Sequence, residues 1–270
     1  MQESDAKEVF TGLMLGDGSI SVSSRYSARF IISQTGEGKL EYLRSIKEAL
    51  AIMGITTLPG YPQVRTRGNA KVSFLQTIST PLLLKEYARW YPNGSKYKEV
   101  PCDIELTPLA VAKWFEGDGN SANIQYGAVR TSIACCGFSE ESILHLEREL
   151  HSLGLHPHRY IIRVKRGSGI CFYIPQSENN LFMDMIRPHV SDVYSYKLKY
   201  REDSPPSTEV VANAESTLTT IWDRHTVYLP SELNTRFMKY LENLKKTFGG
   251  RAKNITMRRA LSEFLDKEGF

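Results

Sequence analysis

The pattern of apolar and polar positions along the chain occurs twice in the same order. Each copy begins with an apolar segment that ends in Gly-Asp-Gly, followed by a β-ribbon, an amphipathic helix, a second ribbon and a closing helix. In the first copy these elements are expected at residues 10–18, 19–34, 38–55, 63–78 and 81–91. In the second copy they are expected at residues 111–119, 120–136, 139–155, 158–174 and 179–190. A glycine, Gly54 or Gly154, marks the end of each amphipathic helix.

This repetition predicts an α+β protein with tandem αββαββα repeats around a pseudo-twofold axis. We expect the first repeat at residues 8–100 and the second at residues 101–203. Each repeat would contain an antiparallel sheet whose alternate side chains lie on one face. Two such sheets suit a near-dyadic partner such as duplex DNA.

The C-terminal part of the chain has a different character. Residues 204–221, with Pro205, Pro206 and several serines and threonines, are typical of a linker. Residues 222–270 predict a small β-α-α module that resembles a ribbon-helix-helix domain. Because such a ribbon pairs with its twin in another chain, this resemblance implies a homodimer. A helical hairpin docked on the core of a monomer fits the sequence nearly as well.

The composition is that of a globular protein. Of 270 residues, 41% are hydrophobic and 24% charged, and the mean hydropathy is −0.32. No apolar run approaches the ~18 residues that a membrane span needs, and the first ten residues lack a secretory pattern. We therefore expect no membrane partner and no secretion, but the cytoplasm of a bacterium or phage host, or an organellar matrix. The cysteines lack zinc-binding spacing and are expected to be buried thiols: Cys102, Cys135, Cys136 and Cys171.

Basic residues gather in two stretches that contain no acidic residue. The net charge is only +4, but no Asp or Glu occurs between Glu48 and Glu86 or between Glu149 and Glu178. Arginines two or four residues apart on a strand share a sheet face, as suits the major groove of double-stranded DNA. The pairs expected to do so are Arg25 with Arg29, Arg65 with Arg67 and Arg159 with Arg163. The full set of candidate DNA-binding residues is Arg25, Arg29, Gln63, Arg65, Arg67, Asn69, Lys71, Asn123, Gln125, Arg130, His158, Arg159, Arg163, Lys165 and Arg166.

The two apolar segments can pack against each other through small residues. Gly12 and Gly16 are four positions apart, so they form a flat stripe on one helical face. The matching stripe in the second copy would be Lys113 and Gly117. Since Lys113 is not small, Ala112 could replace it with a slightly rotated contact.

This packing would bring together two aspartates that are 101 residues apart, Asp17 and Asp118. Two carboxylates at helix C-termini repel each other and the helix dipole, so folding stability gives no reason for the arrangement. Binding a divalent cation against a phosphate does, and hard oxygen ligands with open positions suit Mg²⁺. We therefore predict a metal site at Asp17, Asp118, Gly16 and Gly117.

Residues 10–18, FTGLMLGDG, and 111–119, VAKWFEGDG, resemble the LAGLIDADG signature. With two copies, the chain resembles a single-chain LAGLIDADG homing endonuclease over about residues 8–203. The segments WYPNGSKYKEVP, ELTPLAVAKWFEGDG and SYKLKY are also similar to segments of that family. The resemblance implies a site-specific endonuclease that uses Mg²⁺, with Mn²⁺ as a substitute. It further implies cleavage of a long pseudo-palindromic DNA site, leaving 3′ overhangs.

The resemblance also implies a lysine and a polar residue beside each catalytic aspartate. Lys98 and Lys197 are the candidates because their separation, 99 residues, nearly equals that of the aspartates, with Lys96 as an alternative to Lys98. Gln34 matches the polar pocket residue of the family. Cys136 is expected at the equivalent position of the second copy, which implies unequal half-sites.

Four further interpretations concern roles other than cleavage. Glu116, just before Gly117, is expected to be a surface or hydrogen-bonding residue rather than a metal ligand. A DNA-binding transcription regulator and an RNA-binding intron maturase are alternatives on the same scaffold, although paired aspartates disfavour a pure regulator. An intein is disfavoured because the chain starts at Met1 and lacks a terminal His-Asn pair.

Overall fold

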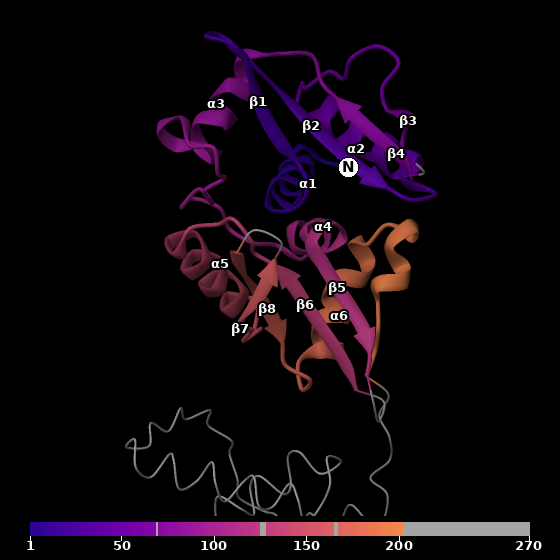
Figure 1. Ribbon diagram of the computed structural model, residues 1–270, viewed down its shortest axis with the longest axis vertical. Helices are drawn as coiled ribbons and strands as arrows, with labels where there is room; N and C mark the ends of the chain where they lie inside the picture. The colour runs from indigo at the N-terminus through magenta and orange to yellow at the C-terminus, as the bar shows by residue number, and fades with distance from the viewer. Residues whose placement is uncertain (69, 125–127, 165–166, 202–270) are drawn as a thin grey trace, which may run out of the picture. The chain divides into compact units, whose positions relative to one another are not determined.

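Two four-stranded antiparallel sheets form the frame of the protein in a computed structural model, which describes residues 1–68, 70–124, 128–164 and 167–201 (Figure 1). The first sheet has the strand order β1-β2-β4-β3 and the second the order β5-β6-β8-β7. The first group of elements is α1 (Glu3–Leu15), β1 (Ser19–Ser24), β2 (Ser27–Thr35), α2 (Lys39–Ile52), β3 (Gln63–Arg67), β4 (Ala70–Gln76) and α3 (Pro81–Trp90). The second group is α4 (Pro108–Asp118), β5 (Gly119–Asn123), β6 (Val129–Ala134), α5 (Glu140–Ser152), β7 (His158–Val164), β8 (Gly167–Ile174) and α6 (Asn179–Ile186). The predicted mixed fold class with two antiparallel sheets is confirmed, as is the predicted order of elements over the described residues.

Short 3₁₀ helices follow both groups. They are η1 (Pro92–Gly94), η3 (Arg187–His189) and η4 (Asp192–Lys197). The amphipathic helices α2 and α5 end two residues before Gly54 and Gly154, which have φ angles of 73° and 78°. A positive φ is easily adopted by glycine, so the predicted stop signals are confirmed.

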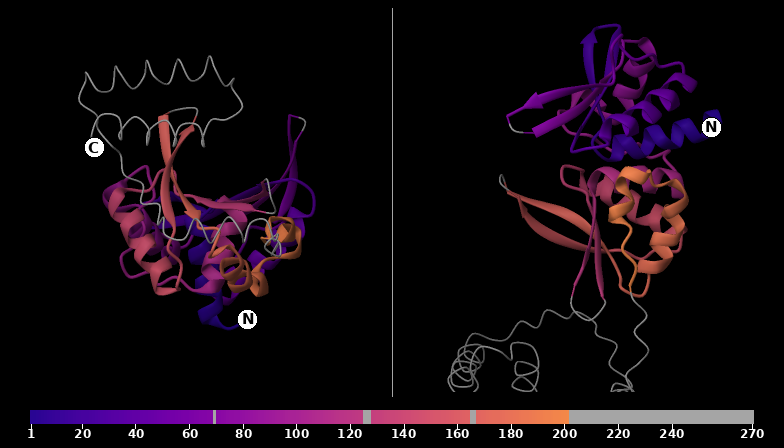
Figure 2. Two further views of the ribbon diagram at one scale, coloured as in Figure 1. Left: turned by 90° about the horizontal axis from the view of Figure 1, so that it is seen from below. Right: turned by 90° about the vertical axis from the view of Figure 1, so that its right-hand side faces the viewer.

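The helices of each group lie on one side of their sheet, as both views of Figure 2 show. Burial along the strands has the corresponding period of two: Ala28, Phe30 and Ile32 of β2 are at most 1% exposed, whereas their neighbours are less buried. In the second sheet Phe172 and Ile174 of β8 have no exposed surface. The opposite face of each sheet carries no helix among the described residues, and this face is called the open face below.

Helices α1 and α4 pack against each other at the junction of the two groups (Figure 1). A Cβ atom added to Gly12 would lie 2.3 Å from the Ala110 carbonyl oxygen and 2.6 Å from Lys113 Cβ. At Gly16 the nearest atoms would be 3.6 Å away and include the Gly117 Cα. The predicted glycine stripe is therefore present. Lys113 itself lies against Gly12 through its Cβ atom, so the proposed replacement by Ala112 is wrong.

The described part of the chain also bears on other expectations. Cys135 and Cys171 are buried as expected, but Cys102 and Cys136 are exposed. No helix among the described residues is both long and apolar enough to cross a bilayer. The linker expected at 204–221 and the module expected at 222–270, with the homodimer it implies, lie outside the described residues.

Candidate active site and DNA interface

Asp17 and Asp118 lie together where α1 and α4 end. A Cβ atom added to Gly117 would be 3.2 Å from Asp17 Oδ2, so the Asp17 carboxylate lies against the residue that precedes Asp118. Burial, and then the negative charge of Asp17, raise the pKa of Asp118 to about 6. The ionised form of Asp118 is thus disfavoured, although the positive charges of Lys98 and Lys197 act in the opposite direction.

The two predicted lysines bind the C-terminal ends of the two helices. Lys98 Nζ donates to the carbonyl oxygens of Met14, Gly16 and Gly18 over 2.7, 2.7 and 3.1 Å. Lys197 Nζ likewise donates to the carbonyl oxygens of Phe115, Glu116, Gly117 and Gly119 over 3.1, 2.7, 3.5 and 2.7 Å. Carbonyls at a helix C-terminus have no partner within the helix and carry partial negative charge, so a buried ammonium group stabilises them.

Burial changes the acidity of both lysines. It lowers the pKa of Lys98, and together with the positive charge of Lys39 it lowers the pKa of Lys197 to about 8. Lys96, the alternative to Lys98, is exposed. Lys98 and Lys197 are therefore the lysines that share the site with the aspartates.

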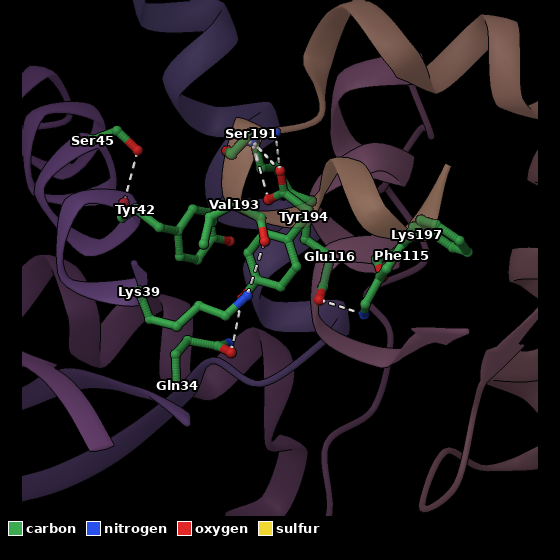
Figure 3. Close-up of polar contacts among 11 residues, drawn as sticks. Gln34, Lys39, Tyr42, Ser45, Phe115, Glu116, Ser191, Val193, Tyr194 and Lys197 are labelled. Carbon is green, nitrogen blue, oxygen red and sulfur yellow. Dashed lines mark hydrogen bonds and ion pairs between the residues drawn. The ribbon is translucent and has the colours of Figure 1, made fainter. Parts of the chain in front are cut away.

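Gln34 reaches the first aspartate from β2. Its Nε2 donates to Asp17 Oδ2 over 2.8 Å, while its Oε1 accepts from the Tyr194 hydroxyl over 2.8 Å (Figure 3 shows Gln34 and Tyr194). Tyr194 was not among the predicted residues. It lies three positions before Lys197, but a contact across 160 residues has no periodic signal in the sequence.

The prediction that Cys136 is the counterpart of Gln34 is wrong by one position. Ile32 pairs with Leu75 in the first sheet and Ile133 pairs with Phe172 at the same point of the second, so Gln34 corresponds to Cys135. The Cys135 thiol is 1% exposed and donates to the Ile133 carbonyl. In the second copy, a buried thiol thus occupies the position of the polar pocket residue.

Glu116 is a buried hydrogen-bonding residue. Its side chain is completely buried and accepts from Lys113 Nζ over 2.9 and 3.1 Å and from the Ser191 backbone N–H over 2.6 Å (Figure 3). Lys113 Nζ also donates to Ser191 Oγ over 3.1 Å. The expected hydrogen-bonding role is correct, whereas a surface position is wrong.

The donor set of the site fits a hard divalent cation. Two carboxylates converge, and burial with the charge of Asp17 keeps the pKa of Asp118 raised even though Lys98 and Lys197 lower it, so a divalent cation would stabilise the ionised form. The described residues contain no group of three or more His, Cys, Asp or Glu side chains that could hold a metal. Asp17 and Asp118 would therefore leave most coordination positions to backbone carbonyls, water or phosphate, as Mg²⁺ tolerates. The carbonyls of Gly16 and Gly117 already accept from the lysines, so each would have to use its second lone pair.

The first sheet presents part of its predicted set on the open face. The strand register places Gln63 and Arg65 on the same face as Arg29. The Arg65 guanidinium donates to the Tyr61 hydroxyl over 2.7 Å and lies 5.1 Å from the Phe74 ring centre. The strand register places Arg67 on the same face as Arg65, although the Arg67 side chain lies outside what the structure describes.

Two other predicted residues of the first sheet are placed differently. Lys71 pairs with Thr66, so it lies on the opposite face from Arg65. Arg25 lies in the turn between β1 and β2, so the expectation that Arg25 and Arg29 share a strand face is wrong. A two-residue turn interrupts the alternation that the expectation assumed.

In the second sheet the open face carries Arg130 and His158. The Arg130 guanidinium lies 5.5 Å from the Tyr160 ring centre. Asn120 is on this face because it pairs with Ser132, two residues from Arg130. Asn120 was missed by the sequence prediction, which named Asn123 on the alternate phase of β5. Counting by twos from the buried Gly119 places Asn123 on the helix-covered face, so the alternate phase, which contains Asn120, lies on the open face.

Arg159 does not face DNA. It pairs with Phe172 on the helix-covered face, and its guanidinium forms ion pairs with Glu147 and Glu140 of α5. The predicted role of Arg159 is therefore wrong, because its charge is already compensated. The Arg163 side chain, and the residues Asn69, Gln125, Lys165 and Arg166, lie outside what the structure describes.

Comparison with known proteins agrees with this geometry. A sequence model of the LAGLIDADG DNA endonuclease family matches residues 7–182, which include most of α1, all of α4 and both sheets. The chain belongs to this family.

Relatives of this LAGLIDADG protein are distant. An uncharacterized protein of Methanocaldococcus jannaschii is 22% identical over 210 residues, which cover 74% of this chain and 75% of the relative. Protein RecA of Mycolicibacterium flavescens is 26% identical over 224 residues, 77% of this chain but only 50% of that protein.

The chain also resembles solved structures. The homing endonuclease I-WcaI bound to its DNA recognition sequence has a TM-score of 0.57 and 20% identity, and the match covers 74% of this chain and 88% of that one. I-DmoI in complex with DNA and Mn has a TM-score of 0.46 and 14% identity, covering 68% and 97% of the two chains. At 20% identity, the I-WcaI match shows that the two proteins share a fold.

Proposed function

We propose that this protein is a site-specific DNA endonuclease of the homing type. It binds a long, pseudo-palindromic duplex along the open faces of its two sheets and hydrolyses both strands, leaving 3′ overhangs. The observation that carries the proposal is the meeting of Asp17 and Asp118 at the ends of two lysine-capped helices. The LAGLIDADG family match and the DNA-bound state of I-WcaI support it.

The aspartate pair is difficult to explain by stability. Each carboxylate lies at the negative end of a helix, and burial together with the charge of Asp17 disfavours ionisation of Asp118. A fold selected only for stability would place a neutral side chain there. A site that must hold a cation against a phosphate needs both charges.

Asp17 and Asp118 would hold the divalent cation, Mg²⁺ or its substitute Mn²⁺. When bound, the cation would supply a Lewis acid for the scissile phosphate and lower the pKa of a coordinated water. Gln34 would orient solvent or phosphate beside Asp17. Lys98 and Lys197 would hold the carbonyl-lined helix ends rigid and add positive charge next to the phosphate.

The open faces would provide binding separately from catalysis. Arg29, Arg65 and Arg130 lie there, and each can contact a phosphate or pair with guanine. Aromatic rings beside Arg65 and Arg130 restrict these guanidinium groups before DNA arrives, so less side-chain entropy is lost on binding.

The first prediction separates cutting from binding. Asp17→Asn keeps the size of the side chain but removes its charge, so we expect cleavage to fall by at least about 100-fold. Affinity for duplex DNA should change by less than about threefold, because DNA contacts lie on the sheets. Cleavage of a supercoiled plasmid carrying a site selected from a randomised library would be measured with Mg²⁺ and with EDTA.

Asp184→Asn is the matched control, because Asp184 is a surface carboxylate whose side chain is 66% exposed. It should cut as the wild type does. Normal cutting by Asp17→Asn would refute the catalytic assignment. Specific binding of duplex without any cleavage by the wild type would favour the regulator, and tight specific binding of an intron transcript would favour the maturase.

A further inference from the structure

A chain of hydrogen bonds connects the two halves of the protein at the site. The Tyr194 hydroxyl donates to Gln34 Oε1 and Gln34 Nε2 donates to Asp17 Oδ2, both over 2.8 Å. Gln34 and Asp17 belong to the first group of elements, whereas Tyr194 lies on η4 after the second. Tyr194 is 2% exposed and Gln34 is 8% exposed, so water cannot easily replace either partner.

The hydroxyl of Tyr194 determines which end of the Gln34 amide faces Asp17. A glutamine amide has an acceptor oxygen and a donor nitrogen, and a half-turn about its last bond exchanges them. The reversed amide would direct its oxygen at the Asp17 carboxylate. Burial and the negative charges of Glu116 and Asp17 raise the pKa of Tyr194 well above its ordinary value, so the phenol remains a donor.

The Tyr194 ring is itself held in place. Tyr42 meets it edge-on with ring centres 5.0 Å apart, and Lys39 Nζ lies 3.2 Å from its ring centre (Figure 3). An ammonium group over an aromatic face is attracted by the ring electrons. The hydroxyl therefore has one position, which suits a group that orients another.

The second half of the site lacks this arrangement. Ser95 lies three residues before Lys98, as Tyr194 lies three before Lys197, but the Ser95 hydroxyl accepts from the Tyr97 backbone N–H. The counterpart of Gln34 is the buried thiol of Cys135. Among the residues that the structure describes, no side chain donates a hydrogen bond to Asp118. The two aspartates thus have unlike surroundings.

We propose that Tyr194 is a positioning residue for the Asp17 half-site, where its hydroxyl keeps the Gln34 amide nitrogen directed at the carboxylate. This inference rests on the proposed endonuclease function. Because the Asp118 half-site has no equivalent, loss of the hydroxyl slows cleavage of one DNA strand and spares the other.

The decisive variant is Tyr194→Phe, which retains the ring and removes only the hydroxyl. We expect the rate on one strand to fall ~10-fold and the rate on the other to fall less than ~2-fold, measured with a duplex labelled differently on each strand. In a Gln34→Ala background the same change should have no further effect, because Tyr194 acts through Gln34. Equal slowing of both strands, or full additivity, would overturn the proposal.

Tyr42→Phe is the matched control. It removes another buried tyrosine hydroxyl of the same cluster, one that interacts with Glu116 rather than Gln34. It should lower stability without a difference between strands. A strand-selective effect of Tyr42→Phe would show that general loosening is the cause, against a specific role of Tyr194.

A second readout does not depend on cleavage. In the wild type the Gln34 side-chain NH₂ resonances should be shifted by the Asp17 carboxylate, and in Tyr194→Phe they should move toward free-amide values. Unchanged resonances would overturn the inference. If the wild type cuts no duplex with Mg²⁺ or Mn²⁺, the proposed function fails while the resonance shift still decides the role of Tyr194.

Discussion

At the scale of single residues, the environment of Asp118 disfavours the ionised form of its carboxyl group. Its pKa is raised to about 6 by burial and by the charge of Asp17, against an ordinary value of 3.8. A carboxyl group with a raised folded-state pKa contributes stability below its unfolded pKa, and this contribution is lost as the pH rises through about 6. At neutral pH the ionised Asp118 therefore lowers the free energy of unfolding, a cost that a cation could offset.

Asp118→Asn should consequently be more stable than the wild type at pH 7. The expected gain is about 1–2 kcal/mol, less than the full pKa shift implies, because the carboxyl group is half-buried and partly screened by solvent. The gain should shrink as the pH falls from 7 toward 4, where the wild-type carboxyl group binds its proton. Urea unfolding at several pH values without metal would measure it.

Asp184→Asn, which neutralises an exposed carboxylate, should show a change of less than about 0.5 kcal/mol over this pH range. If Asp118→Asn is less stable than the wild type at pH 7, then a partner stabilises the Asp118 carboxylate. The interpretation that burial and the charge of Asp17 destabilise this carboxylate would then be incorrect.

At the scale of elements, the contact between α1 and α4 fixes the position of both aspartates. From the sequence, Gly12 and Gly16 are expected to contribute equally to the helix contact, because they are four positions apart on one helical face. In the structure they differ: a Cβ atom at Gly12 would overlap the Ala110 carbonyl, whereas one at Gly16 would make ordinary contacts at 3.6 Å. Only the crossing of the two helices, which no local pattern encodes, distinguishes them.

Gly12→Ala should therefore destabilise the protein by about 2 kcal/mol. Relief of the overlap requires the helices to separate, and this cost exceeds the gain of roughly 1 kcal/mol that alanine brings to a helix interior. Gly16→Ala, with the same chemical change four residues later, should stay within about 1 kcal/mol of the wild type. Thermal unfolding of both variants gives the comparison, and equal losses would contradict the close approach at Gly12.

At the scale of the whole described molecule, the sequence predicted what depends on local periodicity. Helices and ribbons were predictable because burial repeats every two or 3.6 residues within one element. The face on which each strand residue lies was less predictable. Arg159 and Asn123 were assigned to the DNA-binding face because the lengths of the turns, which set the alternation from one strand to the next, cannot be read from the sequence. Contacts between distant segments, such as Tyr194 with Gln34, had no sequence signal at all.

The faces assigned by the strand register lead to a last prediction about DNA binding. Arg130 is exposed on the open face, whereas Arg159 forms ion pairs with Glu140 and Glu147 on the helix side. Each phosphate contact releases counterions, so its loss reduces the salt dependence of binding. Arg130→Gln should weaken binding to any duplex and lower the slope of log affinity against log salt by about 1.

Arg159→Gln removes the same charge but should leave that slope unchanged, since its guanidinium is already neutralised by two carboxylates. It should instead cost about 0.5–1 kcal/mol of stability, as expected for partly exposed ion pairs. Fluorescence anisotropy with a labelled duplex at several salt concentrations measures both slopes without knowledge of the target sequence. A slope lowered equally by the two variants would mean that DNA does not follow the open face, because net charge alone would then account for the binding.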